Sequence, residues 1–220
     1  MNRALILGNK NLSSWSLRPW LALQTAGVEF TEEVIRLDEV ETTANMQRAV
    51  ERHLGRKPEI PFANKVPVFI DHGVAIWESM AILEHTAERY APNLWPSEPG
   101  ARAMARVVSN EMHAGFAALR KNCPMWLKGT RSVEITPGAQ ADAARVQELW
   151  RGCLRAYGAP SKGGPFLFGA FSIADAMFAP VVTRFTTYGF DLDAECQAYA
   201  DAVWALPAMQ VWHAAALKER

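Results

Sequence analysis

The chain has 220 residues, of which half are hydrophobic and about a fifth are charged, so it can bury one large core or two small ones. Lysine plus arginine equal aspartate plus glutamate, at 23 each, and this balance offers no basic excess to bind nucleic acid or an anionic membrane. No apolar run approaches transmembrane length, and the run near the N-terminus is too short for a signal peptide.

The cysteines and histidines give no sign of a redox or metal centre. The three cysteines are odd in number, far apart and without a CxxC pair, and the five histidines show no metal-ligand spacing. Glycine-rich phosphate loops are absent as well. We therefore expect a soluble protein of the reducing cytoplasm that uses no metal.

The segment that follows the first predicted strand carries the first candidate site. Residues 4–7 form a short apolar run that ends at Gly8, and residues 17–25 show helical spacing. Pro19 is tolerated best in the first turn of a helix, which places the N-cap among residues 16–18, with Ser16 the best capping residue. Ser13 and Ser14 then lie in the loop, where the free N–H groups of a helix N-terminus favour an anion. The alternative is that both serines are only turn and capping residues.

The rest of the N-terminal part predicts an α/β domain. A second strand is expected around residues 30–37, a modest amphipathic helix within 38–57, and a hairpin over 65–76. A further helix opens at Ser79, which is a plausible cap. The order β-α-β-(α)-β-β-α predicts that the first two strands are parallel and the last two antiparallel.

After residue 90 the chain changes character. Prolines and a glycine crowd residues 91–100, which is typical of a linker, and no convincing strand follows. Helices are expected over residues 101–119 and 137–156, after Ser172, and twice more between 194 and 217, with a loop at 158–165. The predicted domains are thus 1–90 and 101–220, joined by 91–100.

Three further short motifs accompany the serines. The backbone next to Val66 and Pro67, at the head of the hairpin, can pair with an extended peptide, and the X-Pro bond there could be cis. Glu78 and Ser79 open a helix that can hold a carboxylate, although ordinary capping explains such a pair equally well. Residues 172–175 (SIAD) form a capping box, for which we expect a structural role.

In their order and spacing these motifs resemble the glutathione transferase family, and the likeness covers nearly the whole chain. It rests on residues 13–18 (SSWSLR), 66–67 (VP), 78–79 (ES) and 172–175. The serine-first motif is most similar to bacterial proteins of the zeta and related serine classes. The resemblance implies a thioredoxin-like N-terminal domain, an all-helical C-terminal domain, a cis bond before Pro67 and a homodimer.

The resemblance also implies roles for individual residues. Ser13 or Ser14 would donate a hydrogen bond to the sulfur of glutathione and favour its thiolate. The cysteinyl unit would pair with the backbone of Val66, next to Pro67. The other glutathione-binding residues would be Glu78 and Ser79 at the γ-glutamyl end and Lys65 (or Lys57) at the glycine carboxylate.

The acceptor pocket would lie between the domains, and its candidate walls are Trp15, Met112, Phe116 and Trp126, all of which are equally credible as core residues. A mostly apolar pocket fits a small apolar electrophile. Trp15 stands where the zeta class has a cysteine, and this makes that class's isomerase activity doubtful. The sequence leaves two alternatives to conjugation: a non-catalytic protein-binding module on the same fold, or glutathione-dependent isomerase, peroxidase or dehalogenase chemistry.

Overall fold

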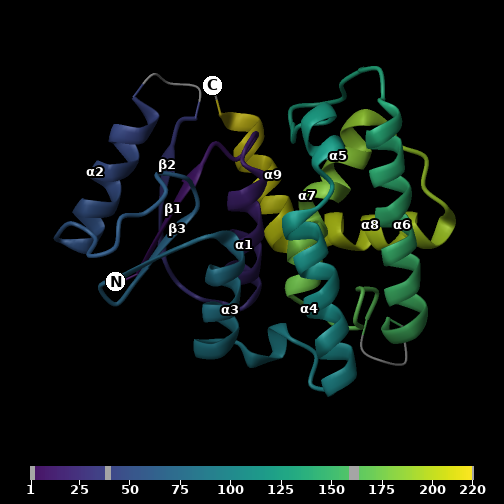
Figure 1. Ribbon diagram of the computed structural model, residues 1–220, viewed down its shortest axis with the longest axis horizontal. Helices are drawn as coiled ribbons and strands as arrows, with labels where there is room; N and C mark the ends of the chain where they lie inside the picture. Colours follow the sequence, from purple (N-terminus) through teal and green to yellow (C-terminus); the bar gives the residue numbers. More distant parts are fainter. Residues whose placement is uncertain (1–2, 38–40, 159–163, 220) are drawn as a thin grey trace.

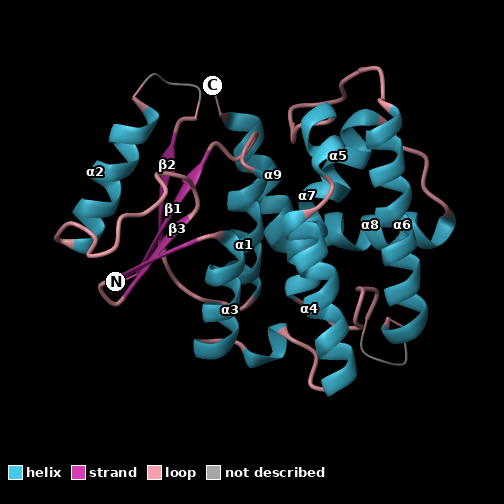
Figure 2. Ribbon diagram, in the orientation of Figure 1, coloured by secondary structure: helices cyan, strands magenta, loops and turns pink. Residues whose placement is uncertain are grey.

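The computed structural model describes residues 3–37, 41–158 and 164–219. A mixed sheet flanked by helices is followed by a region built of helices, as Figures 1 and 2 show. Most of the loop expected at residues 158–165, and the start of the segment 38–57, lie outside the described residues. In the described part of the chain, no helix is long and apolar enough to cross a membrane.

The sheet has the predicted connectivity. Its strand order is β2-β1-β3-β4. The first pair, β1 and β2, is parallel, whereas β3 runs antiparallel to both β1 and β4. The sheet thus joins a parallel β-α-β unit to an antiparallel hairpin, which confirms the expected architecture. The strands are β1 (Arg3–Gly8), β2 (Thr31–Ile35), β3 (Val68–Asp71) and β4 (Val74–Trp77).

The two faces of the sheet pack against different helices because side chains alternate along a strand. Ala4 and Ile6 of β1 belong to a small apolar cluster with α2 (Thr42–Leu54). Leu5 and Leu7 point the other way, into the main core, where α1 (Ser14–Thr25) and α3 (Ser79–Arg89) cover the sheet. Figure 1 shows α2 on the outer side and α1 on the side of the helical region.

The helical region contains one long central helix with others around it. One sequence prediction is wrong here, because the helix expected over residues 101–119 is two helices. The first of these ends before Gly115, and Phe116 takes a left-handed conformation with φ of 58°, which an α-helix does not accommodate. The elements are η1 (Pro92–Leu94), α4 (Pro99–Ala114), α5 (Ala117–Asn122), α6 (Pro137–Tyr157), α7 (Ile173–Tyr188), α8 (Ala194–Ala205) and α9 (Pro207–Lys218).

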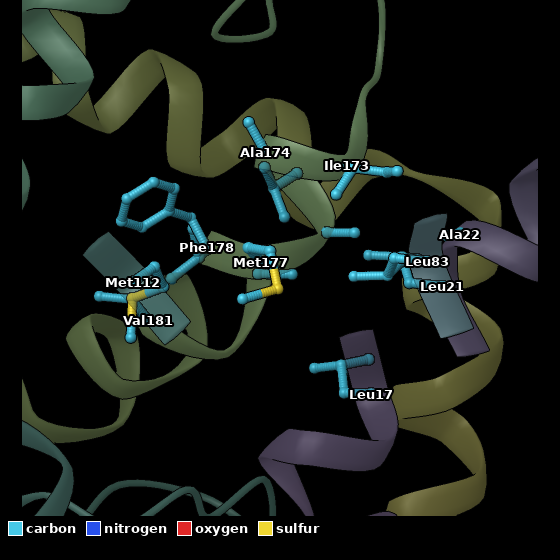
Figure 3. Close-up of a cluster of buried hydrophobic side chains, with 14 of the residues drawn as sticks. Leu17, Leu21, Ala22, Leu83, Met112, Ile173, Ala174, Met177, Phe178 and Val181 are labelled. Atoms are coloured by element: carbon cyan, nitrogen blue, oxygen red, sulfur yellow. The ribbon is translucent and has the colours of Figure 1, made fainter. Parts of the chain in front are cut away.

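The central helix α7 joins the two regions through one apolar core. Its side chains pack against α1 and α4, and Figure 3 shows Met177 of α7 beside Leu17 and Leu21 of α1. Pro180 lies within α7. The core that supports the sheet therefore continues into the helical region, and the start of α1 lies close to the boundary between them.

The capping box at the start of α7 is confirmed. The Asp175 carboxylate accepts the Ser172 N–H at 2.8 Å and the Ser172 hydroxyl at 2.8 Å, and it also accepts the Leu167 N–H at 3.1 Å. Asp175 is fully buried, and burial raises its pKa to about 6. These bonds satisfy donors at a buried helix start, which is the structural role expected of this box.

Candidate functional site

The N-terminus of α1 begins three residues earlier than the proline suggested. The cap is Ser13, not Ser16: its Oγ accepts the Ser16 N–H at 3.3 Å, and its carbonyl accepts the Leu17 N–H. Pro19 therefore lies inside the helix, where it lacks one backbone donor. The capping bond of Ser13 and the bonds of Ser16 offset this loss, since the Ser16 Oγ accepts the Gly8 N–H at 3.0 Å and the Ser13 hydroxyl at 2.8 Å.

The hydrogen bonds divide the two candidate serines into different roles. The Ser13 hydroxyl is used within the helix start, because it both donates to Ser16 and accepts from it. The Ser14 Oγ instead accepts a hydrogen bond from Nη2 of Arg184, at 3.2 Å. A hydroxyl that accepts in this way still has its own proton to donate. Ser14 is therefore the serine whose O–H can serve a ligand.

A cleft of about 150 Å³ lies beside this helix start. Its walls come from the segment before β3, from the end of β4 and from the first turns of α1 and α3. The peptide bond between Val66 and Pro67 is cis, as the resemblance implies. The lining residues are Trp15, Ala63, Lys65, Val66, Pro67, Trp77, Glu78 and Ser79.

The start of α3 presents two groups to this cleft. Ser79 is the first helical residue and not the cap; the cap position belongs to Glu78, whose φ of 70° is rare for a residue with a side chain. The Ser79 hydroxyl is buried and has no hydrogen-bond partner among the described residues. A buried, unpaired hydroxyl at a helix N-terminus is suited to donate a hydrogen bond to a carboxylate and hold it there.

Trp15 lines the cleft and also contacts several basic side chains. The guanidinium groups of Arg18 and Arg120 lie 4.4 and 5.3 Å from the centre of its ring, and His113 meets the ring edge-on at 5.3 Å. The His113 Nε2 is 3.9 Å from a carboxylate oxygen of Glu78. Burial, followed by the charge of Arg18, lowers the pKa of His113, so the imidazole is neutral at pH 7.

The loop that leads into α1 is held by distant parts of the chain. The Glu219 carboxylate accepts the N–H groups of Lys10 and Asn11, at 2.5 and 2.9 Å. Asn11 in turn accepts the Leu127 N–H at 2.7 Å, and Asn9 accepts the Leu37 N–H at 2.7 Å. The serines therefore start from a fixed loop, and little conformational freedom is left to lose when a ligand binds.

The candidate acceptor walls occupy different places. Trp15 lines the cleft, but Met112 and Phe116 are buried in the main core. Trp126 packs under the Arg131 guanidinium, which lies 3.7 Å from its ring centre, and its carbonyl accepts the Thr187 hydroxyl. The structure thus brings Trp15, Lys65, Val66, Pro67, Glu78 and Ser79 together in the lining of the cleft. Ser13 and Ser14 directly precede Trp15 in the chain, but they are buried and are not among the lining residues.

Sequence analysis missed the arginines next to Ser14 and Trp15. Arg184 is the only charged residue between Asp175 and the end of α7, and it is buried. A single cation in an otherwise apolar helix is expensive to bury, and this signal was available in the sequence. The sequence gives no such indication for Arg120, because it is followed by Lys121 and the pair is typical of a solvent-exposed helix end.

Comparison with known proteins identifies the family. The models of the glutathione S-transferase N-terminal and C-terminal domains match residues 5–88 and 108–215. Glutathione S-transferase U16 of Arabidopsis thaliana is 30% identical over 182 residues, which cover 77% of this chain and 67% of that protein. The chain belongs to the glutathione S-transferase family.

Solved structures agree on the fold. A glutathione transferase homolog from Burkholderia with bound glutathione has a TM-score of 0.67 at 20% identity, covering 99% of each chain. A diazinon-metabolizing glutathione S-transferase of the silkworm Bombyx mori has a TM-score of 0.73 at 17% identity, covering 99% of this chain and 98% of the other. A theta class enzyme from Xanthomonas axonopodis pv. citri, also with glutathione bound, has a TM-score of 0.67 at 23% identity and covers 99% of each chain.

Proposed function

We propose that this protein binds glutathione and transfers its sulfur to a small electrophile, with Ser14 as the donor to the thiolate. The observation that carries the proposal is the hydrogen-bond arrangement of the serines. Ser13 is used as the helix cap, whereas Ser14 accepts from Arg184 and keeps its proton free. Glutathione in the cleft would run past the backbone of Val66 with its γ-glutamyl end at Ser79 and Glu78.

The energy that this site must supply is modest. A free thiol has a pKa near 8.5, so only a small fraction is thiolate at neutral pH. Lowering that pKa by about two units requires ~2.7 kcal/mol of preferential stabilisation of the anion. One hydroxyl donor to a charged sulfur supplies roughly 1.5–3 kcal/mol. The helix N-terminus adds about 0.3–1 kcal/mol. These two contributions suffice, and the nearby positive charge of Arg184 acts in the same direction.

The chemical step needs no further group from the protein. The thiolate sulfur attacks an electrophilic carbon and forms a carbon–sulfur bond. In a substitution, the leaving group departs with the electron pair of the broken bond. In an addition, the pair moves into the conjugated system, which then takes a proton from water. Isomerase, peroxidase and dehalogenase reactions use the same thiolate, and they remain alternatives at this site.

A complete site favours an enzyme over a module that only binds protein partners. The feature that supports this choice is the buried, unpaired hydroxyl of Ser79 in the lining of the cleft, where a bound carboxylate would complete it. A homodimer and a place in detoxification stay predictions from the family.

The serine assignment is tested by titrating the thiol of bound glutathione. The ultraviolet absorbance of the thiolate, followed against pH, gives the pKa without any electrophile. Ser14→Ala is expected to raise that pKa by about one to two units, because a donor worth roughly 1.5–3 kcal/mol is lost. Turnover of an activated aryl halide at neutral pH should fall by about ten- to a hundredfold.

Ser13→Ala is the matched control. It removes the N-cap, so we expect it to lower the free energy of unfolding by about 1 kcal/mol while leaving the thiol pKa in place. If Ser13→Ala moves the pKa and Ser14→Ala does not, the two serines have been assigned the wrong way round. If glutathione does not raise the melting temperature of the unaltered protein or of either variant, the proposed function is wrong.

A further inference from the structure

Three arginines from three helices gather around the start of α1, next to Ser14 and Trp15. Arg18 comes from α1, Arg120 from α5 and Arg184 from α7. Arg18 and Arg184 are 1% and 3% exposed, and Arg120 is half-buried. Since an arginine keeps its proton under all ordinary conditions, the cluster concentrates three positive charges at the boundary between the two regions.

The hydrogen bonds of these arginines go to groups that carry no charge. Arg18 donates from Nε to the Met177 carbonyl at 3.2 Å, and Arg120 donates from Nη1 to the His113 carbonyl at 3.2 Å. Arg184 donates to the Cys123 and Pro180 carbonyls, at 2.9 Å each, and to Ser14. Carbonyls and hydroxyls satisfy the donors, but they leave the charges uncompensated, whereas buried charges are ordinarily paired.

The charges that act on Arg18 reinforce this imbalance, whereas Arg120 has a carboxylate acting on it. Beyond burial, the pKa of Arg18 is lowered by Arg184 and by Arg120, so its charged neighbours are cations. A carboxylate that acts on Arg120 is that of Asp142, which already accepts the Leu119 N–H. The Nη1 of Arg18 is buried and has no partner among the described residues. The cluster therefore has the positive electrostatic field of an anion-binding site, although the unpartnered Arg18 Nη1 is too deeply buried to be the contact itself.

We propose, on the basis of the transferase function above, that the electrophile carries a small anionic group such as a carboxylate, which Arg120 binds beside the ring of Trp15. Arg120 is the one of the three that is only half-buried, so it is the arginine that a substrate can reach. Arg18 and Arg184 strengthen the field at that point without direct contact. This proposal differs from the expected small apolar electrophile in a mostly apolar pocket, since guanidinium groups flank the indole of Trp15.

The test uses two product-like ligands that differ in one group. S-pentylglutathione and S-(4-carboxybutyl)glutathione have side chains of equal length, which end in a methyl group and a carboxylate. Their dissociation constants on the unaltered protein are measured by calorimetry. We expect the carboxylate to bind about tenfold more tightly or better, because it gains a charge-assisted hydrogen bond in a partly desolvated site. This comparison needs no variant.

Two variants then locate the site. Arg120→Met should abolish the advantage of the carboxylate and leave the affinity for S-pentylglutathione within about twofold. Arg155→Met removes the same charge from an exposed ion pair between Arg155 of α6 and Glu195 of α8, and it should leave the advantage unchanged. If Arg120→Met fails to fold, Arg120→Gln takes its place.

Each outcome decides between the two proposals. Equal or weaker binding of the carboxylate overturns the anionic acceptor, and it would mean that the thiolate alone compensates the arginines, with the transferase function intact. A carboxylate advantage that survives the loss of the Arg120 charge overturns the assignment to this cluster. If neither conjugate nor glutathione binds, the proposed function itself fails.

Discussion

Two buried serines share an unpaired hydroxyl, and their position relative to the cleft is what separates them. Ser79 and Ser109 both have a buried Oγ without a partner among the described residues, but only Ser79 lines the cleft. Ser109 lies within α4. A buried hydroxyl that makes no bond costs stability, and a ligand in the cleft would remove that cost at Ser79 but not at Ser109.

Ser79→Ala is therefore expected to weaken glutathione binding without weakening the fold. The dissociation constant should rise by about tenfold or more, because the ligand carboxylate loses a hydrogen bond worth roughly 1.5–3 kcal/mol. The midpoint of chemical unfolding should stay the same or rise slightly. Ser109→Ala, the control, should leave glutathione affinity unchanged. Equal affinity of Ser79→Ala and the unaltered protein would remove Ser79 from the site.

The buried carboxylate of Asp175 makes stability depend on pH. Its pKa is raised from 3.8 to about 6, mainly by burial. The folded protein therefore holds a proton that the unfolded chain releases near pH 4. The contribution of this group is fully present below pH 4 and is lost as the pH rises through about 6.

Asp175→Asn should remove that dependence, since an amide does not titrate. We expect the free energy of unfolding of the unaltered protein, relative to the variant, to fall by up to ~3 kcal/mol between pH 4 and 6. Denaturant unfolding of both proteins at several pH values gives this difference. It also cancels the opposite contributions of Asp71 and Asp193, whose pKa values are lowered. A difference that is independent of pH would mean that Asp175 titrates normally.

At the scale of elements, the sequence predicted what periodicity and capping determine, and it failed where backbone conformation decided. The order of strands, the hairpin and the capping box followed from apolar alternation and from turn and capping residues. The start of α1 did not follow in this way. The sequence predicted a later start because proline is tolerated best in the first turn of a helix, whereas in the structure the hydrogen bonds of Ser13 and Ser16 stabilise an earlier start with Pro19 inside the helix. The cluster of arginines arises from three separate helices, and no local pattern contains it.

The break between α4 and α5 is an element boundary that depends on one glycine. A methyl group added at Gly115 would lie 2.7 Å from the backbone carbonyl of Glu111, and backbone cannot move aside as a side chain can. Gly115→Ala should therefore destabilise the protein by about 1–3 kcal/mol. In contrast, Gly152 lies inside α6 with open space around its added methyl. Gly152→Ala should stabilise it by about 0.5–1 kcal/mol.

Both substitutions are checked by the midpoint of chemical unfolding. The pair separates the conformational preference of alanine, which both variants share, from the steric cost at the boundary. A stabilising Gly115→Ala would show that the chain closes this break into the longer helix that the sequence suggests.

At the scale of the molecule, the cleft depends on two regions that share one core. Leu5 and Leu7 of β1 lie in the same apolar cluster as Phe178 and Val182 of α7, so the sheet has no separate main core of its own. Polar contacts add to this link: Arg18 donates to the Met177 carbonyl, and Glu219 near the C-terminus caps the loop before Ser13. Only the small cluster under α2 is independent of the helical region.

The shared core predicts that β1 and α7 unfold as one cooperative unit. Native-state hydrogen exchange measures the free energy of opening for individual amides. The amides of Leu5 and Leu7 should open at the same free energy as those of Phe178 and Val182, whereas amides of α2 should open at a lower value. Different free energies for β1 and α7 would mean that the sheet folds on its own. In that case the geometry of Ser14 and Arg184 would exist only while the two regions are docked, and glutathione would have to supply part of that docking free energy.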